Sequence, residues 1–162
     1  MKIYILRHGQ AQPKHATIKE QERELTKEGI DNTRSMLLMA KVLGTEVERI
    51  VSSPYRRAVQ TAEIAKEVFR PKEREVIEND VLEPDSTPYE VSSYLAKLSS
   101  ERILLVSHQP LLGELFRSYV GGELDLIFPP SSMARIDVNE SGKLEGTLVW
   151  LLSSDILNGK AK

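Results

Sequence analysis

Two kinds of hydrophobic pattern alternate along this chain. Short runs of consecutive apolar residues, such as Ile3–Leu6 and Ile103–Val106, are typical of strands buried on both faces of a sheet. Between such runs, small or apolar residues recur every three or four positions, as at Ala58, Ala62 and Ala65, which indicates helices with one buried face. We predict strands over residues 2–6, 49–52, 75–77, 102–106, 133–138 and 146–152, and helices over residues 26–44, 54–69, 87–98 and 110–121.

Residues that start and stop helices support these boundaries. Thr26 can cap the first helix and Gly44 can end it. Ser53 is predicted to cap the second helix, with Pro54 at its first position. The run Thr87-Pro88-Tyr89-Glu90 matches the capping-box pattern at the start of the third helix. On the first helix, the spacing predicts a buried face formed by Ile30, Thr33, Leu37 and Ala40.

The alternation of strands and helices predicts an α/β domain of three layers, in which helices cover both faces of a mostly parallel central sheet. A chain of 162 residues that is 40% hydrophobic can form one such domain with a substantial core, so we assign residues 1–162 to a single domain. In folds of this kind, ligands bind at the carboxyl ends of the strands. The residues that follow the strands are therefore the candidates for function.

Charge and composition exclude several classes of protein. Twenty-two Lys and Arg residues against 24 Asp and Glu residues give a formal net charge of -2, which is too balanced for a general nucleic-acid binder or a polybasic membrane anchor. The absence of cysteine excludes disulfides, thiol catalysis and thiolate metal sites. The apolar runs are too short for a membrane span or a secretory signal. We expect a cytoplasmic protein that binds neither nucleic acid nor membranes.

Three predicted strands end in residues suited to phosphate chemistry. These residues are Arg7-His8-Gly9, the run from Ser53 to Arg57, and Ser107-His108-Gln109. An imidazole nitrogen can attack phosphorus, a guanidinium can hold two phosphate oxygens, and a glycine lets the backbone approach a ligand. A single histidine at a strand end is more often structural, because most buried polar groups are simply hydrogen-bonded. Two histidines and at least two arginines on one rim together indicate a phosphate site.

These three motifs resemble those of the histidine phosphatase superfamily. In this chain the second motif reads SPYRRAVQTA, from Ser53 to Ala62. Within the superfamily, the chain is most similar to the SixA-type phosphohistidine phosphatases. That similarity rests on its short length and on three segments: Leu25–Gly29, Ser107–Gly113, and Asn139–Gly142 before a Trp-bearing strand. The resemblance runs from Met1 to about Asp155. It implies a phosphoglycerate mutase-like fold and a phosphatase that needs no cofactor.

The resemblance also implies a role for each residue of the motifs. His8 would be the nucleophile, forming a transient phosphohistidine that water then hydrolyses. Arg7 and Arg57 would hold the phosphate oxygens, and a protonated His108 would add a further positive charge. Gln109 stands where a helix begins, so its backbone would direct partial positive charge at the phosphate, and we include it as phosphate-binding.

Other charged residues near the motifs are not assigned to the site. Adjacent residues of a helix point about 100° apart, so only one of Arg56 and Arg57 can readily face the pocket. The resemblance implies that this residue is Arg57, from its place before Ala58, and we expect Arg56 to be a surface charge that faces solvent or substrate. His15 lies in the polar stretch 10–24, which we predict to be a mobile surface loop. Lys14 stands where larger superfamily members carry an asparagine, and it could either contact phosphate or point to solvent. Three histidines without ligand spacing, beside arginines, do not indicate a metal site.

The general acid is the least defined part of the predicted site. Larger members of the superfamily take it from a middle loop, where Glu83 and Asp85 are the candidates, and we include Glu83 among the catalytic residues. The imidazole released from phosphohistidine needs less help from an acid than an alkoxide does. The short connections between strands also predict an open pocket that a protein side chain can enter.

These considerations favour a phosphatase that acts on phosphohistidine in proteins. A phosphomonoesterase or mutase of the same superfamily, acting on a small phosphate ester, is the nearest alternative. A module that binds phosphate without turning it over is the alternative from a different functional class.

Overall fold

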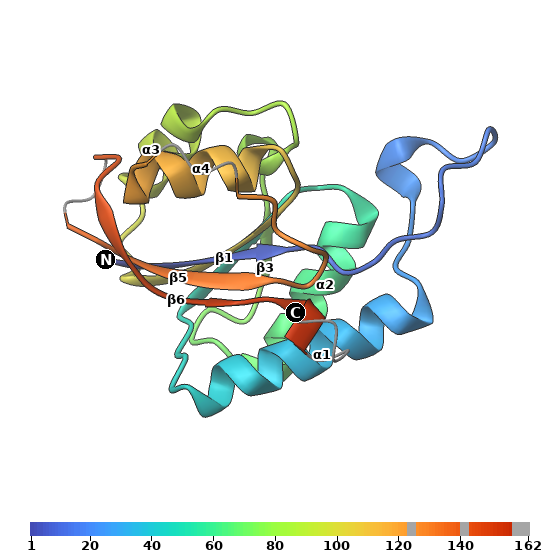
Figure 1. The fold of residues 1–162 in the computed structure, drawn as a ribbon, viewed down its shortest axis with the longest axis horizontal. Helices are drawn as coiled ribbons and strands as arrows, with labels where there is room; N and C mark the ends of the chain where they lie inside the picture. Colours follow the sequence, from blue (N-terminus) through green and yellow to red (C-terminus); the bar gives the residue numbers. More distant parts are fainter. Residues whose placement is uncertain (123–125, 140–142, 157–162) are drawn as a thin grey trace.

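A six-stranded sheet lies at the centre of the fold (Figure 1). The computed structural model describes residues 1–122, 126–139 and 143–156. The strands run in the spatial order β3-β2-β4-β1-β5-β6. Neighbouring strands among the first four are parallel, whereas β5 is antiparallel to both β1 and β6, so the predicted mostly parallel sheet is confirmed. The strands are β1 (Lys2–Arg7), β2 (Arg49–Ser52), β3 (Val76–Glu78), β4 (Arg102–Ser107), β5 (Met133–Val138) and β6 (Gly146–Leu152).

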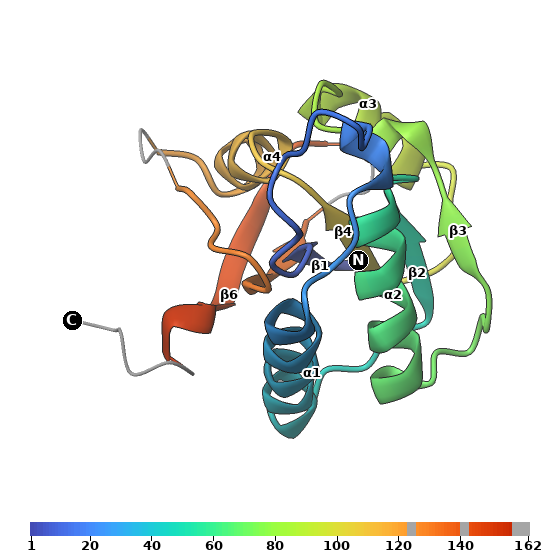
Figure 2. The same cartoon turned by 90° about the vertical axis from the view of Figure 1, so that its right-hand side faces the viewer.

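Helices cover both faces of this sheet, as predicted (Figure 2). One face carries α1 (Lys27–Val42) and α2 (Arg56–Phe69), and the other carries α3 (Pro88–Leu95) and α4 (Leu111–Val120). Successive side chains of a strand point to opposite faces, so β1 contributes to two separate cores. Tyr4 and Leu6 lie in the core with α1 and α2, whereas Ile3 and Ile5 lie in the core with α3 and α4.

Two of the predicted helix caps are present. The Thr26 hydroxyl accepts a hydrogen bond from the Gly29 backbone N–H at 3.0 Å at the start of α1. At the start of α3, the Thr87 hydroxyl accepts from the Glu90 N–H at 3.3 Å, and the Glu90 carboxylate accepts from the Thr87 N–H at 2.8 Å. This reciprocal pair is the capping box that the sequence predicts.

Two local predictions for α1 and α2 are wrong. Ser53 does not cap α2, which begins at Arg56 after Tyr55. Its hydroxyl is instead within hydrogen-bonding distance of His108. Ile30 is 37% exposed, because the buried face of α1 is turned toward Gly29. A Cβ on Gly29 would lie 2.2 Å from the Gln10 carbonyl oxygen, so this turn of the helix packs directly on the chain that follows β1.

The chain between β1 and α1 forms a loop that is fixed at its base. Ala11 and Leu25 form an isolated antiparallel bridge, and the Gln12 N–H donates to the Glu24 carbonyl at 2.8 Å. A short 3-10 turn, η1 (Glu20–Glu22), lies within the loop. The predicted turn after β5 falls partly on residues 140–142, which lie outside the described residues.

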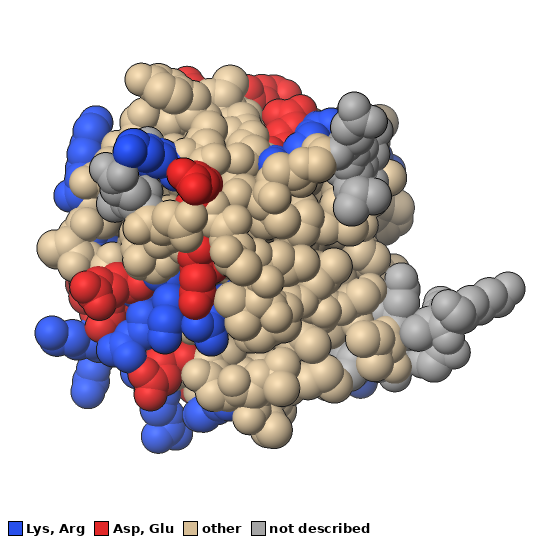
Figure 3. All heavy atoms as spheres, turned by 60° about the vertical axis from the view of Figure 1, so that its left-hand side comes forward, with Lys and Arg blue, Asp and Glu red and all other residues tan. Residues whose placement is uncertain are grey.

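Basic and acidic side chains are mixed on the surface. On the face that Figure 3 shows, lysines and arginines lie next to aspartates and glutamates, and a broad area of the same face carries neither. Arg102, for example, forms ion pairs with Glu46 and Glu48. Within the described part of the chain, the helices are too short or too polar to cross a membrane.

Candidate active site

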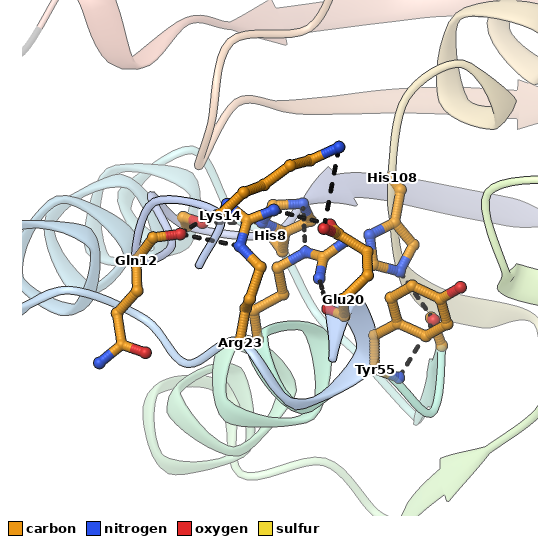
Figure 4. Close-up of polar contacts among 10 residues, drawn as sticks. His8, Gln12, Lys14, Glu20, Arg23, Tyr55 and His108 are labelled. Atoms are coloured by element: carbon orange, nitrogen blue, oxygen red, sulfur yellow. Dashed lines mark hydrogen bonds and ion pairs between the residues drawn. The ribbon is translucent and has the colours of Figure 1, made fainter. Parts of the chain in front are cut away.

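The three strand ends singled out by the sequence meet at one rim of the sheet. Strands β2, β4 and β1 are neighbours and parallel, so the residues that follow them lie side by side. The ring centroids of His8 and His108 are 4.9 Å apart, and the Nε of Arg57 lies 3.1 Å from Nε2 of His8. The topology thus gathers Arg57 and the two histidines, which Figure 4 labels, into one cluster.

His8 is held as a neutral ring with a defined tautomer. Its Nδ1 lies 2.7 Å from the Gly9 carbonyl oxygen, and because that oxygen can only accept, the proton resides on Nδ1. The Nε2 lone pair is then free to accept the hydrogen bond from Arg57. Burial, together with the nearby charges of Arg57 and Arg7, lowers the pKa of His8 to about 3. The hydrogen bond to the Gly9 backbone acts in the opposite direction and raises this pKa, but it is outweighed. At neutral pH Nε2 is therefore an unprotonated nitrogen.

Close packing of the backbone fixes the position of His8. A Cβ on Gly9 would lie 2.5 Å from the Thr33 hydroxyl and 2.8 Å from the Gly29 carbonyl, so only glycine fits between β1 and α1. The Gly9 N–H also donates to the Thr61 hydroxyl of α2 at 3.1 Å. The glycine of the first motif therefore serves the packing behind the histidine.

His108 is buried with one ring nitrogen engaged and the other unpaired. Its Nε2 lies 2.7 Å from the Ser53 hydroxyl, whereas Nδ1 has no hydrogen-bond partner among the described residues. The Tyr55 ring packs beside it, with centroids 4.9 Å apart. Burial, then the neighbouring His8, Arg57 and Arg7, lowers the pKa of His108 to about 2. The His108 ring, which would add a positive charge if protonated, is therefore neutral in this structure.

The two arginines approach the cluster from different elements. Arg7 ends β1 and its Nη1 donates to the Phe128 carbonyl, while its buried Nε has no partner among the described residues. Arg57 lies in the first turn of α2, is 5% exposed and has its guanidinium carbon 5.0 Å from the centre of the Tyr55 ring. Burial lowers the pKa of both arginines. Arg56 is exposed, as expected, and pairs with Glu24 at 3.1 Å.

Gln109 and Glu83 lie at the edge of this cluster. The Gln109 side chain caps α4, because its Oε1 accepts from the Gly113 N–H at 3.2 Å and its Nε2 donates to the Leu126 carbonyl at 3.4 Å. Glu83 follows the 3-10 turn η2 (Asp80–Leu82) and is near enough to Tyr55 that its charge, after burial, raises the pKa of that phenol. The Gln109 side chain is therefore bound to the start of α4 and to the Leu126 carbonyl. Glu83 is close enough to Tyr55 for its charge to act on that residue.

Two further charged residues, Glu20 and Arg23, lie over the cluster (Figure 4). Sequence reasoning did not find them. Glu20 Oε1 is 3.2 Å from Nη2 of Arg57 and 2.6 Å from Nη1 of Arg23, and Lys14 Nζ is 3.9 Å from Oε2 (Figure 4). Arg23 is held in turn by the Gln12 carbonyl, to which its Nε and Nη2 donate at 2.8 and 2.6 Å. The polar loop has no periodicity that would have singled out either residue.

The arrangement is suited to an anion rather than to a metal. Among the described residues, no group of three or more histidine, cysteine or carboxylate side chains could hold a metal ion. The cluster instead combines a neutral imidazole nitrogen with guanidinium groups that can hold phosphate oxygens. It can therefore perform nucleophilic attack on phosphorus.

Comparisons with known proteins agree with this chemistry. Residues 3–83 match the family model of the histidine phosphatase superfamily (branch 1). The chain is 35% identical over 161 residues to phosphohistidine phosphatase SixA of Escherichia coli strain K12, covering 94% of each. The chain belongs to the histidine phosphatase superfamily. The resemblance to SixA proteins that the sequence motifs indicate is confirmed.

Two further comparisons support the assignment. A solved structure of the protein histidine phosphatase SixA complexed with tungstate superimposes with a TM-score of 0.85 at 33% identity, covering 97% of this chain and 99% of that one. A SixA homologue of Haemophilus influenzae strain Rd is 28% identical over 158 residues, covering 87% of this chain and 92% of that protein. The likeness therefore extends over almost the whole length of this superfamily member.

Proposed function

We propose that this protein is a SixA-like phosphohistidine phosphatase that works through a phosphorylated His8. The observation that carries the proposal is the neutral, buried Nε2 of His8, which lies 3.1 Å from the Arg57 guanidinium and faces His108. The SixA proteins that resemble this chain over nearly its whole length support the choice of reaction.

In the first step, the Nε2 lone pair of His8 forms a bond to phosphorus while the bond to the leaving group breaks. The Arg7 and Arg57 guanidiniums stabilise the charge on the phosphoryl oxygens in the transition state. Arg57 Nε donates to Nε2 of His8 in this structure, so it has to release Nε2 before attack and can then donate to a phosphoryl oxygen. Water then attacks phosphorus, releasing inorganic phosphate and returning the electron pair to Nε2.

His108 has a separate task in this proposal. Its unpaired Nδ1 belongs to a ring within 4.9 Å of His8, so a phosphoryl group bound there can accept a hydrogen bond from it once that nitrogen is protonated. A bound phosphate dianion favours the protonated His108 ring by Coulomb attraction. This attraction opposes the effect of burial, which favours the neutral ring. His108 therefore gains its charge together with the ligand.

The nature of the leaving group favours phosphohistidine as the substrate. The imidazole of phosphohistidine departs as a neutral ring when its other nitrogen already carries a proton, whereas an alkoxide needs an acid at hand. Glu83 remains the candidate acid, because its charge acts on Tyr55, whose ring packs beside His108. A groove of about 420 Å³ lies next to the start of α2 and is lined by Gln21, Glu22, Pro54, Arg56, Val59 and Glu78, so this side of the loop is open to solvent.

A comparison of substrates tests the proposal. We expect kcat/KM for a phosphohistidine-bearing phosphotransfer domain to exceed that for small sugar phosphates by at least about 100-fold, since only the former has a good leaving group and surface contacts. His15→Ala, a change at an exposed histidine, should hydrolyse both substrates at the wild-type rate. Faster hydrolysis of a sugar phosphate than of the phosphoprotein would instead identify a small-molecule phosphomonoesterase or mutase.

A further inference from the structure

The loop between β1 and α1 touches the catalytic cluster through one acidic residue. Its base is fixed by the Ala11–Leu25 bridge and by the Leu25 N–H, which donates to the Gln60 side chain at 2.8 Å. From Pro13 to Lys19 the residues are exposed, whereas Glu20 is half-buried. Glu20 is thus the point where the outer part of the loop rests on Arg57.

Glu20 binds Arg57 with both its backbone and its side chain. Arg57 Nη1 donates to the Glu20 carbonyl at 2.7 Å, and Arg57 Nη2 pairs with Glu20 Oε1 at 3.2 Å. Arg23 holds the same carboxylate oxygen at 2.6 Å, and Lys14 lies 3.9 Å from the other oxygen. A carboxylate among these cations occupies the kind of site that a phosphoryl group also seeks.

Each of the three guanidinium nitrogens of Arg57 therefore makes a contact. Its Nε donates to the His8 Nε2 lone pair, while its Nη1 and Nη2 hold Glu20. A phosphoryl group that binds the same N–H groups has to displace these contacts. A carboxylate that stays in place also repels a dianion beside it, because like charges a few ångströms apart disfavour each other.

We propose that Glu20 is an internal anion that competes with phosphate for Arg57, and that this competition selects against small anions. The inference rests on the proposed function of the same site and adds a determinant of specificity to it. A small ligand such as inorganic phosphate has only the phosphate contacts with which to displace the carboxylate. A phosphoprotein gains further contacts on the surface around the pocket, and these offset the displacement.

The test compares Glu20→Gln with Glu22→Gln. Both changes remove one negative charge from the same 3-10 turn, but Glu22 is exposed and lies on the neighbouring groove. The glutamine at position 20 keeps the backbone carbonyl that Arg57 binds, so the loop should fold. Glu20→Ala is a second variant with the same expected direction, and circular dichroism and thermal melting check that each variant is folded.

Binding of inorganic phosphate, measured by isothermal titration calorimetry, is the primary readout. We expect Glu20→Gln to bind phosphate about threefold to tenfold more tightly than wild type, and Glu22→Gln to remain within about twofold. With p-nitrophenyl phosphate, KM should fall by a similar factor in Glu20→Gln. The preference for a phosphohistidine domain over this small ester should shrink accordingly.

Phosphate affinity in Glu20→Gln that equals or falls below that of Glu22→Gln would overturn the inference. A kcat reduced more than about tenfold, with phosphate affinity unchanged, would instead show that Glu20 donates a proton to the leaving group. The binding measurement needs no phosphohistidine substrate. The inference can therefore fail while the proposed phosphatase stands, and it can hold if the natural substrate proves to be a small ester.

Discussion

Arg57 Nε donates a hydrogen bond to Nε2 of His8 at 3.1 Å, across 49 positions of the sequence. This contact joins the first turn of α2 to the end of β1 and places a guanidinium against the nitrogen that we propose as the nucleophile. The lone pair of that nitrogen is therefore hydrogen-bonded in this structure. Attack by Nε2 on phosphorus requires Arg57 Nε to change partners.

The neighbouring arginines Arg56 and Arg57 provide a matched pair for mutation. Arg57→Lys should lower kcat/KM by about 100-fold or more, because a lysine cannot reproduce the planar fork that holds two oxygens. Arg56→Lys should change it by less than about threefold, since Arg56 is exposed and pairs with Glu24. Steady-state kinetics with p-nitrophenyl phosphate measure both. Equal losses in the two variants would contradict the assignment of Arg57.

Ser53 is predicted to position His108. Ser53→Ala removes the hydroxyl that lies 2.7 Å from His108 Nε2, and we expect kcat to fall by about tenfold and its pH dependence to shift. Ser107→Ala is the control, because its buried hydroxyl donates to the Leu82 carbonyl at 2.7 Å instead. Both variants should lose about 1 kcal/mol of stability, measured by urea unfolding. A merely structural role for Ser53 would leave the two pH profiles of kcat alike.

Most of the catalytic cluster could be predicted from the sequence, because motifs at the ends of neighbouring parallel strands must meet at one rim. Helix geometry shows only that one of Arg56 and Arg57 faces inward, and the resemblance to the family motif selects Arg57. Ser53 was misread as a helix cap because a serine before a proline fits that pattern equally well. Glu20 and Arg23 gave no signal, since their contacts depend on how an aperiodic loop folds back over the site.

The charge state of His108 was also beyond sequence reasoning. A strand-end histidine beside arginines can be protonated or neutral, and the degree of burial decides between the two. Burial dominates in this structure and favours the neutral ring.

The two buried histidines should make stability depend on pH. Burial lowers the pKa of His8 to about 3 and that of His108 to about 2, from an ordinary value of 6.5. Between about pH 6.5 and pH 3 the unfolded chain therefore binds more protons than the folded one, so stability falls as the pH falls. The slope should approach about 1.4 kcal/mol per pH unit for each histidine.

Urea unfolding at several pH values between 7 and 4 measures this slope. The double variant His8→Gln, His108→Gln should show a shallower dependence than wild type. His15→Gln should leave the slope unchanged, because His15 is exposed. Identical slopes in all three proteins would contradict the neutral state of the buried rings.

Gly29 is predicted to be essential for the packing of α1 behind the site. A Cβ there would lie 2.2 Å from the Gln10 carbonyl oxygen, so Gly29→Ala should destabilise the fold by about 2 to 4 kcal/mol. Lys27→Ala, at an exposed position of the same helix, should change stability by less than about 0.5 kcal/mol. Thermal denaturation of both variants makes the comparison. A neutral effect of Gly29→Ala would show that the loop can move away from α1 at little cost.

The phosphorylated enzyme itself is the most direct test of the proposed mechanism. A phosphohistidine-bearing domain or p-nitrophenyl phosphate is mixed with the enzyme, the reaction is stopped with alkali within milliseconds, and the phosphorylated residue is located by mass spectrometry. We predict acid-labile phosphate on His8 in wild type, none in His8→Ala, and loss of turnover in that variant. Turnover in His8→Ala at a rate comparable to wild type, or a phosphoryl group on any other residue, would contradict the account.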